Sequence, residues 1–290
     1  MIFGEPMTKC LRRLAALLAP VLLAAPAIAQ GPAATTMASG GVGLRSEVAA
    51  LRIVAAQRLP RSPVGERPDF CRHLFATART PAGGQVIAAG WAVTREAAFG
   101  PYQAVSFVRG AEPGTSGTCR MLDGNVAIFR GTDLVAIVYA PGGGDAIGSV
   151  SAFGGDALRI WSGDFLGQPV ADLQVGADGG IAVRPLAAEE RVCGGRAVVP
   201  NVYGRPINEA RAILQRSGWT PVPPQARDGN DSRVSDLVRR GVPEVEDCSG
   251  TGFGFCAYSY GGAAGTLSVT TVGDNDFPAV AGYSVRCRLG

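Results

Sequence analysis

Two neighbouring carboxylates are the side chains in this sequence with the most obvious potential for acid–base chemistry. Glu244 and Glu246 stand two residues apart, and on a strand they would share one face at a spacing of about 6.6 Å. Glycoside hydrolysis uses two carboxylates roughly 5–9 Å apart across a cleft. The pair therefore keeps a carboxylate-dependent hydrolase open as one function, although a solvated strand face explains the same residues without catalysis.

Other common catalytic chemistries lack their residues. His73 is the only histidine and Lys9 the only lysine, so a multi-histidine metal site, a lysine Schiff base and a Walker phosphate loop are excluded. No Gly-x-Ser-x-Gly motif of a serine hydrolase occurs. Acidic stretches such as residues 274–276 are typical of turns. We therefore predict no cofactor, no metal site and no catalytic residue beyond the open question of the carboxylate pair.

Aromatic residues offer a candidate binding surface. In an extended strand Phe253 and Phe255 share one face, and Tyr258 and Tyr260 share the other. One face should pack in the core, whereas the other could form an exposed aromatic strip for a glycan or a protein. The predicted binding residues are Tyr203, Trp219, Tyr258 and Tyr260.

The N-terminal segment has the pattern of a secretory signal peptide. Lys9, Arg12 and Arg13 form a positive start, and residues 14–29 form an apolar run that ends in small residues. This run is shorter than the roughly 20 residues of a membrane-spanning helix. We therefore expect residues 1–29 to be removed, the mature chain to be periplasmic or secreted, and no stable membrane insertion after cleavage.

Cysteine usage agrees with export. Of 7 cysteines, Cys10 lies in the predicted signal peptide, which leaves six. An even number of cysteines in an exported chain indicates disulfides rather than free thiols. Six cysteines allow 15 connectivities, and local pairing within each predicted domain favours one of them. The expected pairs are Cys71 with Cys119, Cys248 with Cys256, and Cys193 with Cys287.

The chain after the signal peptide divides into three regions. Residues 30–68 predict a flexible linker with a short helix at residues 44–57. Residues 69–190 predict a β-rich domain without helices, an antiparallel meander closed as a sandwich or barrel, because short apolar runs alternate with Gly-rich turns. Its strands are expected at residues 85–93, 102–108, 125–130, 133–139, 149–153, 157–161, 169–175 and 181–185.

Residues 191–290 predict a small α+β domain. Pro206 and Gly218 flank a helix with apolar residues at helical spacing. A second helix is expected between Asp231 and Gly241. Four strands are expected after it, at residues 243–248, 253–260, 267–272 and 280–286.

The start of this region resembles the opening of a PASTA domain. Residues 199–204 read Val-Pro-Asn-Val-Tyr-Gly, and Glu209-Ala210, Leu214 and Gly218-Trp219 follow. The resemblance covers about 21 of the 290 residues, and the chain otherwise resembles exported bacterial proteins of no assigned activity. PASTA modules are wall-associated and some bind peptidoglycan fragments, so the resemblance implies contact with the cell wall.

These observations favour a binding function. The formal net charge is only +3, and no long basic run occurs, so nucleic acid is not an expected partner. We predict an exported cell-envelope binding or interaction protein without catalytic activity, which contacts peptidoglycan or a partner protein. A carboxylate-dependent envelope hydrolase and a secreted inhibitor remain the two alternatives.

Overall fold

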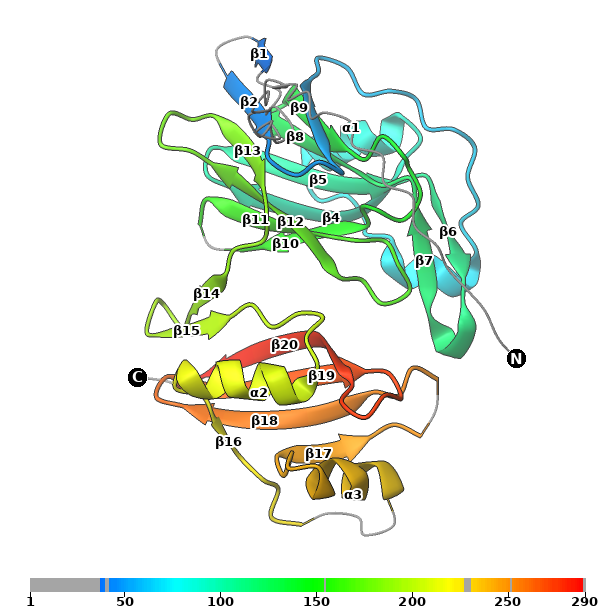
Figure 1. The fold of residues 1–290 in the computed structure, drawn as a ribbon. Helices are drawn as coiled ribbons and strands as arrows, with labels where there is room; N and C mark the ends of the chain where they lie inside the picture. Colours follow the sequence, from blue (N-terminus) through cyan, green and yellow to red (C-terminus); the bar gives the residue numbers. More distant parts are fainter. Residues whose placement is uncertain (1–36, 40–41, 154, 227–230, 251, 289–290) are drawn as a thin grey trace, which may run out of the picture. The chain divides into compact units, whose positions relative to one another are not determined.

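The computed structural model describes residues 37–39, 42–153, 155–226, 231–250 and 252–288. The predicted signal peptide and the start of the predicted linker lie outside these residues. Most of the described elements are strands (Figure 1), so the predicted β-rich fold is confirmed. The described residues belong to one compact unit that spans Ala34–Gly290, and the division into two domains at residue 191 stays a prediction.

Two sheets contain most strands of the first part of the chain (Figure 1). One sheet has, in order, β1 (Met37–Ser39), β2 (Val42–Ser46), β13 (Ile181–Arg184), β12 (Pro169–Val175), β11 (Ala157–Trp161) and β10 (Ser149–Ala152). The other has β3 (Arg52–Ala55), β9 (Asp133–Tyr139), β8 (Asn125–Arg130), β5 (Tyr102–Val108) and β4 (Ala92–Phe99). Neighbouring strands are antiparallel except β2 and β13, which are parallel.

Both sheets contribute to one apolar core. Leu44 and Ile160 of the first sheet belong to the same buried cluster as Ile128 of the second. The alternate residues of the second sheet, such as Phe107, belong to another cluster together with Val86 of helix α1 (Pro81–Ala88). Because successive residues of a strand point to opposite faces, α1 covers the face of the second sheet that is turned away from the shared core.

Two predictions for this part of the chain are wrong. Residues 44–57 were expected to form a helix, but β2 and β3 form instead, because Leu44 pairs with Ile181 and Ile53 with Val138 far along the chain. Residues 85–93 were expected to be a strand in a region without helices, but they contain the end of α1. The side chain of Thr80 caps that helix by accepting a hydrogen bond from the amide of Gly83.

The last part of the chain forms an antiparallel sheet with two helices. The sheet has β16 (Thr220–Pro221), β18 (Cys256–Gly262), β19 (Gly265–Val272) and β20 (Ala279–Cys287) in order, and β17 (Val245–Cys248) also pairs with β18. The helices are α2 (Ile207–Arg216) and α3 (Ser232–Arg239), close to their expected positions. Gly218 has a φ of 85°, which suits the left-handed turn predicted after α2.

All three predicted disulfides are present. Cys71–Cys119 joins the 3-10 helix η1 (Asp69–Leu74) to β7 (Cys119–Leu122), which pairs with β6 (Gly110–Pro113). Cys193–Cys287 joins β20 to the turn between β14 (Glu189–Val192) and β15 (Ala197–Pro200). Cys248–Cys256 joins β17 to β18. Disulfides persist in oxidising compartments, so the three bonds indicate an oxidising environment for the folded chain.

Candidate functional site

The predicted carboxylate pair does not form a catalytic site. Glu244 is fully buried. Its Oε1 accepts a hydrogen bond from the Tyr260 hydroxyl at 2.8 Å, and its Oε2 accepts one from Arg211 Nε at 3.2 Å. Glu246 is exposed, and a bulge interrupts β17 between Val245 and Asp247. The two carboxylates therefore do not face a common cleft, and Glu244 belongs to the interior of the fold.

The predicted aromatic strip is likewise not exposed. Trp219 has a relative exposure of 2%, and Tyr258 and Tyr260 have 0%. All three lie in the apolar cluster that α2 and α3 share with the sheet. Burial, which outweighs a hydrogen bond from Thr271, raises the pKa of Tyr258 to about 12. The alternation of side chains along a strand correctly predicted that Tyr258 and Tyr260 share one face of the sheet. This face packs in the core and is not a binding surface.

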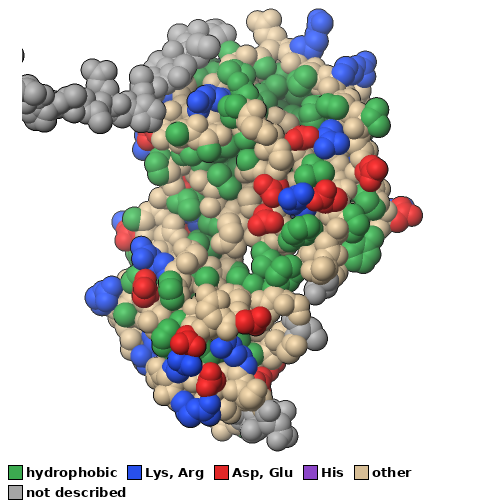
Figure 2. Space-filling view, turned by 45° about the vertical axis from the view of Figure 1, so that its right-hand side comes forward, with side chains coloured by type: hydrophobic (Ala, Val, Ile, Leu, Met, Phe, Trp, Pro, Cys, Tyr) green, Lys and Arg blue, Asp and Glu red, His purple; other side chains and the backbone are tan. Residues whose placement is uncertain are grey.

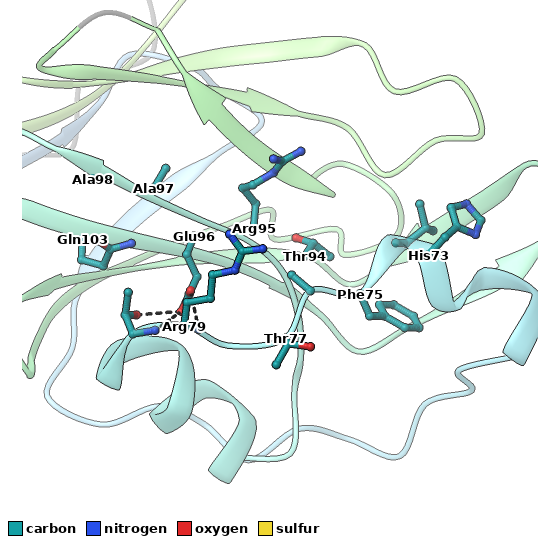
Figure 3. A pocket seen from close by; sticks show the side chains of 13 residues that line it. His73, Phe75, Thr77, Arg79, Thr94, Arg95, Glu96, Ala97, Ala98 and Gln103 are labelled. Atoms are coloured by element: carbon teal, nitrogen blue, oxygen red, sulfur yellow. Dashed lines mark hydrogen bonds between the residues drawn. The ribbon is translucent and has the colours of Figure 1, made fainter.

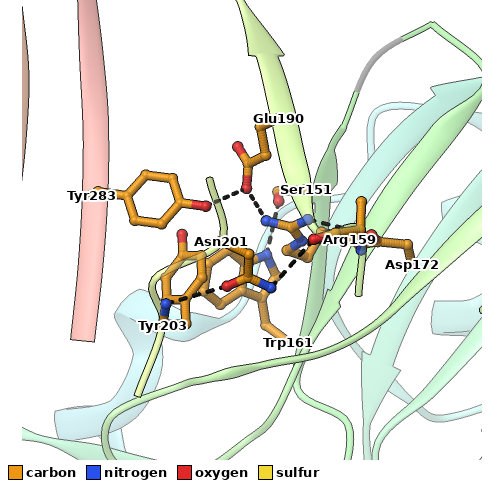
Figure 4. Close-up of polar contacts among 9 residues, drawn as sticks. Ser151, Arg159, Trp161, Asp172, Glu190, Asn201, Tyr203 and Tyr283 are labelled. Carbon is orange, nitrogen blue, oxygen red and sulfur yellow. Dashed lines mark hydrogen bonds and ion pairs between the residues drawn. The ribbon is translucent and has the colours of Figure 1, made fainter. Parts of the chain in front are cut away.

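Tyr203 is half-buried in a polar cluster around Arg159 (Figure 4). The Arg159 side chain is 3% exposed, and its Nε lies 2.9 Å from Asp172 Oδ1. Glu190 accepts from Arg159 and, at 2.8 Å, from the Tyr283 hydroxyl. Burial alone would lower the pKa of Arg159, but the Asp172 hydrogen bond and the charge of Glu190 raise it.

The Arg159 cluster connects distant parts of the chain. Arg159 lies on β11, Asp172 on β12, Glu190 on β14 and Tyr283 on β20. The guanidinium also stacks over the Phe153 ring at 4.1 Å. Every charged group in the cluster has a partner inside it. The cluster therefore holds these strands together and leaves no charged group free to bind a ligand.

A cavity of about 480 Å³ lies beside β4 and is the better candidate site (Figure 3). It is lined by residues 73–77, 79 and 80, by residues 94–98 of β4 and by Gln103 of β5. We call it the β4 cavity. Its charged and titratable side chains are His73, Arg79, Arg95 and Glu96.

The chain builds the β4 cavity from a covalently fixed segment. The Cys71–Cys119 disulfide holds η1, and the chain then runs beside β4, where the amide of Ala76 donates to the carbonyl of Val93 at 2.8 Å. At Thr80 it turns into α1. The cavity is therefore bounded by the segment before α1 on one side and by β4 on the other.

Neutral donors hold the only carboxylate that lines the cavity among the described residues. Glu96 accepts hydrogen bonds from the amide of Arg79 at 2.8 Å and from the Thr80 hydroxyl at 2.8 Å. A side chain on Gly83 would collide with this carboxylate, which fits tightly against the start of α1. A negative charge is favourable at a helix N-terminus, so Glu96 is held there by α1 rather than by an arginine.

Arg79 and Arg95 consequently have no ion-pair partner within the described part of the chain. Both side chains are exposed, and Figure 3 shows Arg95 and Glu96 leaving β4 in opposite directions. On the face shown in Figure 2, some arginine side chains lie among acidic ones and others stand apart from them. Two unpaired guanidinium groups beside one cavity are suited to bind an anion.

His73 lies at one end of the cavity, where it is exposed. Its Nδ1 is 3.1 Å from the carbonyl oxygen of Phe70. In the sequence His73 stood out only as the single imidazole, and Arg79 and Arg95 carried no distinguishing signal. The Thr80-Pro81 pair, a common helix start, could have located α1 and with it one wall of the cavity.

The described residues contain neither a metal-ligand cluster nor a membrane-spanning helix. Among these residues, no group of three or more His, Cys, Asp or Glu side chains is placed to hold a metal ion. In the same residues, no helix has both the length and the apolar character needed to cross a membrane.

Comparison with known proteins gives no assignment. No protein-family model matches the chain, and neither a curated protein nor a solved structure matches it.

Proposed function

We propose that the chain is an exported cell-envelope binding protein that acts without catalysis and recognises carboxylate groups of its ligand. The observation that carries this proposal is the pair of unpaired guanidinium groups, Arg79 and Arg95, beside the β4 cavity. Guanidinium groups bind carboxylates through charge-assisted hydrogen bonds. The cavity volume of about 480 Å³ falls within the range of about 300–1,000 Å³ that is usual for ligand sites.

Export and the envelope location rest on several supports. The three disulfides suit an oxidising compartment. Residues 1–29 have the pattern of a signal peptide, and residues 199–219 resemble the start of a wall-associated PASTA domain. Peptidoglycan stem peptides and acidic segments of envelope proteins both carry carboxylates, so either source would supply the chemistry that the β4 cavity selects.

The test is a pull-down of the purified protein on isolated peptidoglycan sacculi and, in parallel, on beads that carry an acidic peptide. We expect retention on at least one of the two supports. The Arg79→Gln/Arg95→Gln double variant should bind about tenfold more weakly, because exposed charge pairs contribute up to about 1 kcal/mol each. Raising the ionic strength should weaken the binding of the native protein as well.

A matched control separates a specific contact from the loss of two positive charges. Arg216 and Arg288 are exposed and lie outside the β4 cavity, so Arg216→Gln/Arg288→Gln makes the same change in net charge. This control should bind like the native protein. Equal weakening in both double variants, or no retention on either support, would contradict the proposal.

A further inference from the structure

The β4 cavity lies along the edge of a sheet. β4 is the terminal strand of its five-stranded sheet, and β5 is its only strand partner among the described residues. In an antiparallel pair, alternate residues turn their amide and carbonyl groups away from the partner strand. Such groups form a template on which another extended chain can pair.

The register shows which groups face outward. The carbonyl of Val93 accepts a hydrogen bond from Ala76, so the backbone of Val93 faces away from β5. Beyond the bulge between Val93 and Arg95, Phe99 pairs with Tyr102 at the end of the hairpin. Inward-facing and outward-facing backbone groups alternate along β4 between the bulge and Phe99. This alternation places the backbone groups of Glu96 and Ala98 on the outer edge.

The chain itself covers part of this edge, because β10 packs close to β4 and the Thr94 hydroxyl donates to the carbonyl of Gly148. Residue Ala76 occupies it opposite Val93, and the chain then turns away at Thr80 to begin α1. No described backbone group outside β5 pairs with the backbone of Glu96 or Ala98. Ala98 is exposed, and its small side chain leaves room along the edge.

The surrounding charges specify which chain would fit. Arg95 extends from β4 on the side opposite to Glu96, and Arg79 approaches from the segment on the other wall of the cavity (Figure 3). An extended peptide presents its side chains alternately to its two faces. Acidic side chains on a strand added beside β4 would therefore meet a guanidinium group, whereas basic side chains would be repelled.

We propose that the outer edge of β4, at Glu96 and Ala98, receives an extended acidic segment of a partner polypeptide as an added strand, with its carboxylates on Arg79 and Arg95. This inference rests on the proposed function for the role of the two arginines, and adds to it the class of ligand and the way it is held. The backbone pairing supplies affinity, and the arginines supply selectivity for acidic side chains.

The test uses a synthetic peptide, acetyl-Glu-Thr-Glu-Thr-Glu-Thr-amide, and the same peptide with every backbone amide N-methylated. Both carry the same charge, but only the first can donate backbone hydrogen bonds. We expect the first peptide to bind at least tenfold more tightly in a titration followed by ¹⁵N NMR. The amides of Glu96 and Ala98 should shift and gain protection from hydrogen exchange when it binds.

A protein variant gives a second readout. Ala98→Pro removes an amide from the outer edge and should weaken binding of the first peptide to the level of its N-methylated form, whereas Ala98→Gly should retain binding. If Ala98→Pro does not fold, the comparison of the two peptides on the native protein still decides the question.

The outcomes separate this inference from the proposed function. Equal binding of the two peptides through Arg79 and Arg95 would overturn strand addition and leave carboxylate recognition intact. Binding of sacculi through the same arginines, without binding of the acidic peptide, would also overturn it in favour of the cell wall. If the Arg79→Gln/Arg95→Gln variant binds both ligands as the native protein does, the proposed function fails together with the inference.

Discussion

The disulfide between Cys193 and Cys287 should contribute more to stability than the one between Cys248 and Cys256. The first closes a loop with a sequence separation of 94, and the second closes one of 8. In the chain-entropy account, a crosslink stabilises the fold by restricting the unfolded chain, and more so for a longer loop. This relation gives about 4.7 kcal/mol for the long loop and about 2.5 kcal/mol for the short one.

The perturbation is replacement of each pair by alanine, and the assay is urea unfolding with the free energy extrapolated to water. Cys193→Ala/Cys287→Ala should lower the free energy of unfolding by about 2 kcal/mol more than Cys248→Ala/Cys256→Ala. The comparison is conservative, because Cys256 is buried and its truncation adds a packing loss to the short-loop variant. An equal or smaller loss in the long-loop variant would refute the reasoning.

Three further predictions concern the buried polar groups. Glu244→Gln should lower the free energy of unfolding by about 1–3 kcal/mol, since it weakens charged hydrogen bonds. Glu246→Gln, at an exposed position, should change it by less than about 0.5 kcal/mol. Chemical denaturation of the two variants measures the difference. Arg159→Met should cost about 3–5 kcal/mol in the same assay, because it leaves the Asp172 carboxylate buried without its partner, and a near-neutral result would contradict that role. The pKa of Tyr258 rises from 10.0 to about 12 on folding, so the folded protein retains a proton that the unfolded chain releases, and stability should fall as the pH rises from about 10 to about 12. Tyr258→Phe should make that fall shallower, and an unchanged slope in alkaline unfolding curves would be evidence against it.

Local signals in the sequence identified much of the C-terminal part. Pro206 and Gly218 flank α2, and the side chain of Asp231 caps α3. These helix ends were predictable because capping depends on the residue types at and next to the end of the helix. The cysteine pairs were predictable because each pair joins elements of the same predicted region. Six cysteines alone would not have chosen among the connectivities.

Elements that depend on distant partners were not predictable. β2 pairs with β13 and β3 pairs with β9, so the apolar residues near Leu44 and Ile53 form strands although their local spacing resembles a helix. The helix α1 contains two adjacent glycines, which lower helix propensity. Its stability comes instead from the Thr80 cap and from Val86 packing in the core.

The candidate site depended on information that no local pattern contains. The sequence shows which residues are arginines, but only the folded chain shows that Arg79 and Arg95 meet beside one cavity without an acidic partner among the described residues. Glu96 is the nearest acidic residue in the sequence to Arg95, yet neutral donors at the start of α1 hold its carboxylate. Burial likewise decided that the face of Tyr258 and Tyr260 is core.

The most direct test of the central claim follows the arginine side chains themselves. The Nε–H signals of ¹⁵N-labelled protein can be recorded during a titration with the acetyl-Glu-Thr-Glu-Thr-Glu-Thr-amide peptide. Recognition of carboxylates in the β4 cavity predicts that the signals of Arg79 and Arg95 move and that those of Arg216 and Arg288 do not, with smaller shifts at high salt. Signals of Arg79 and Arg95 that stay in place, or that move no more than those of Arg216 and Arg288, would contradict the claim.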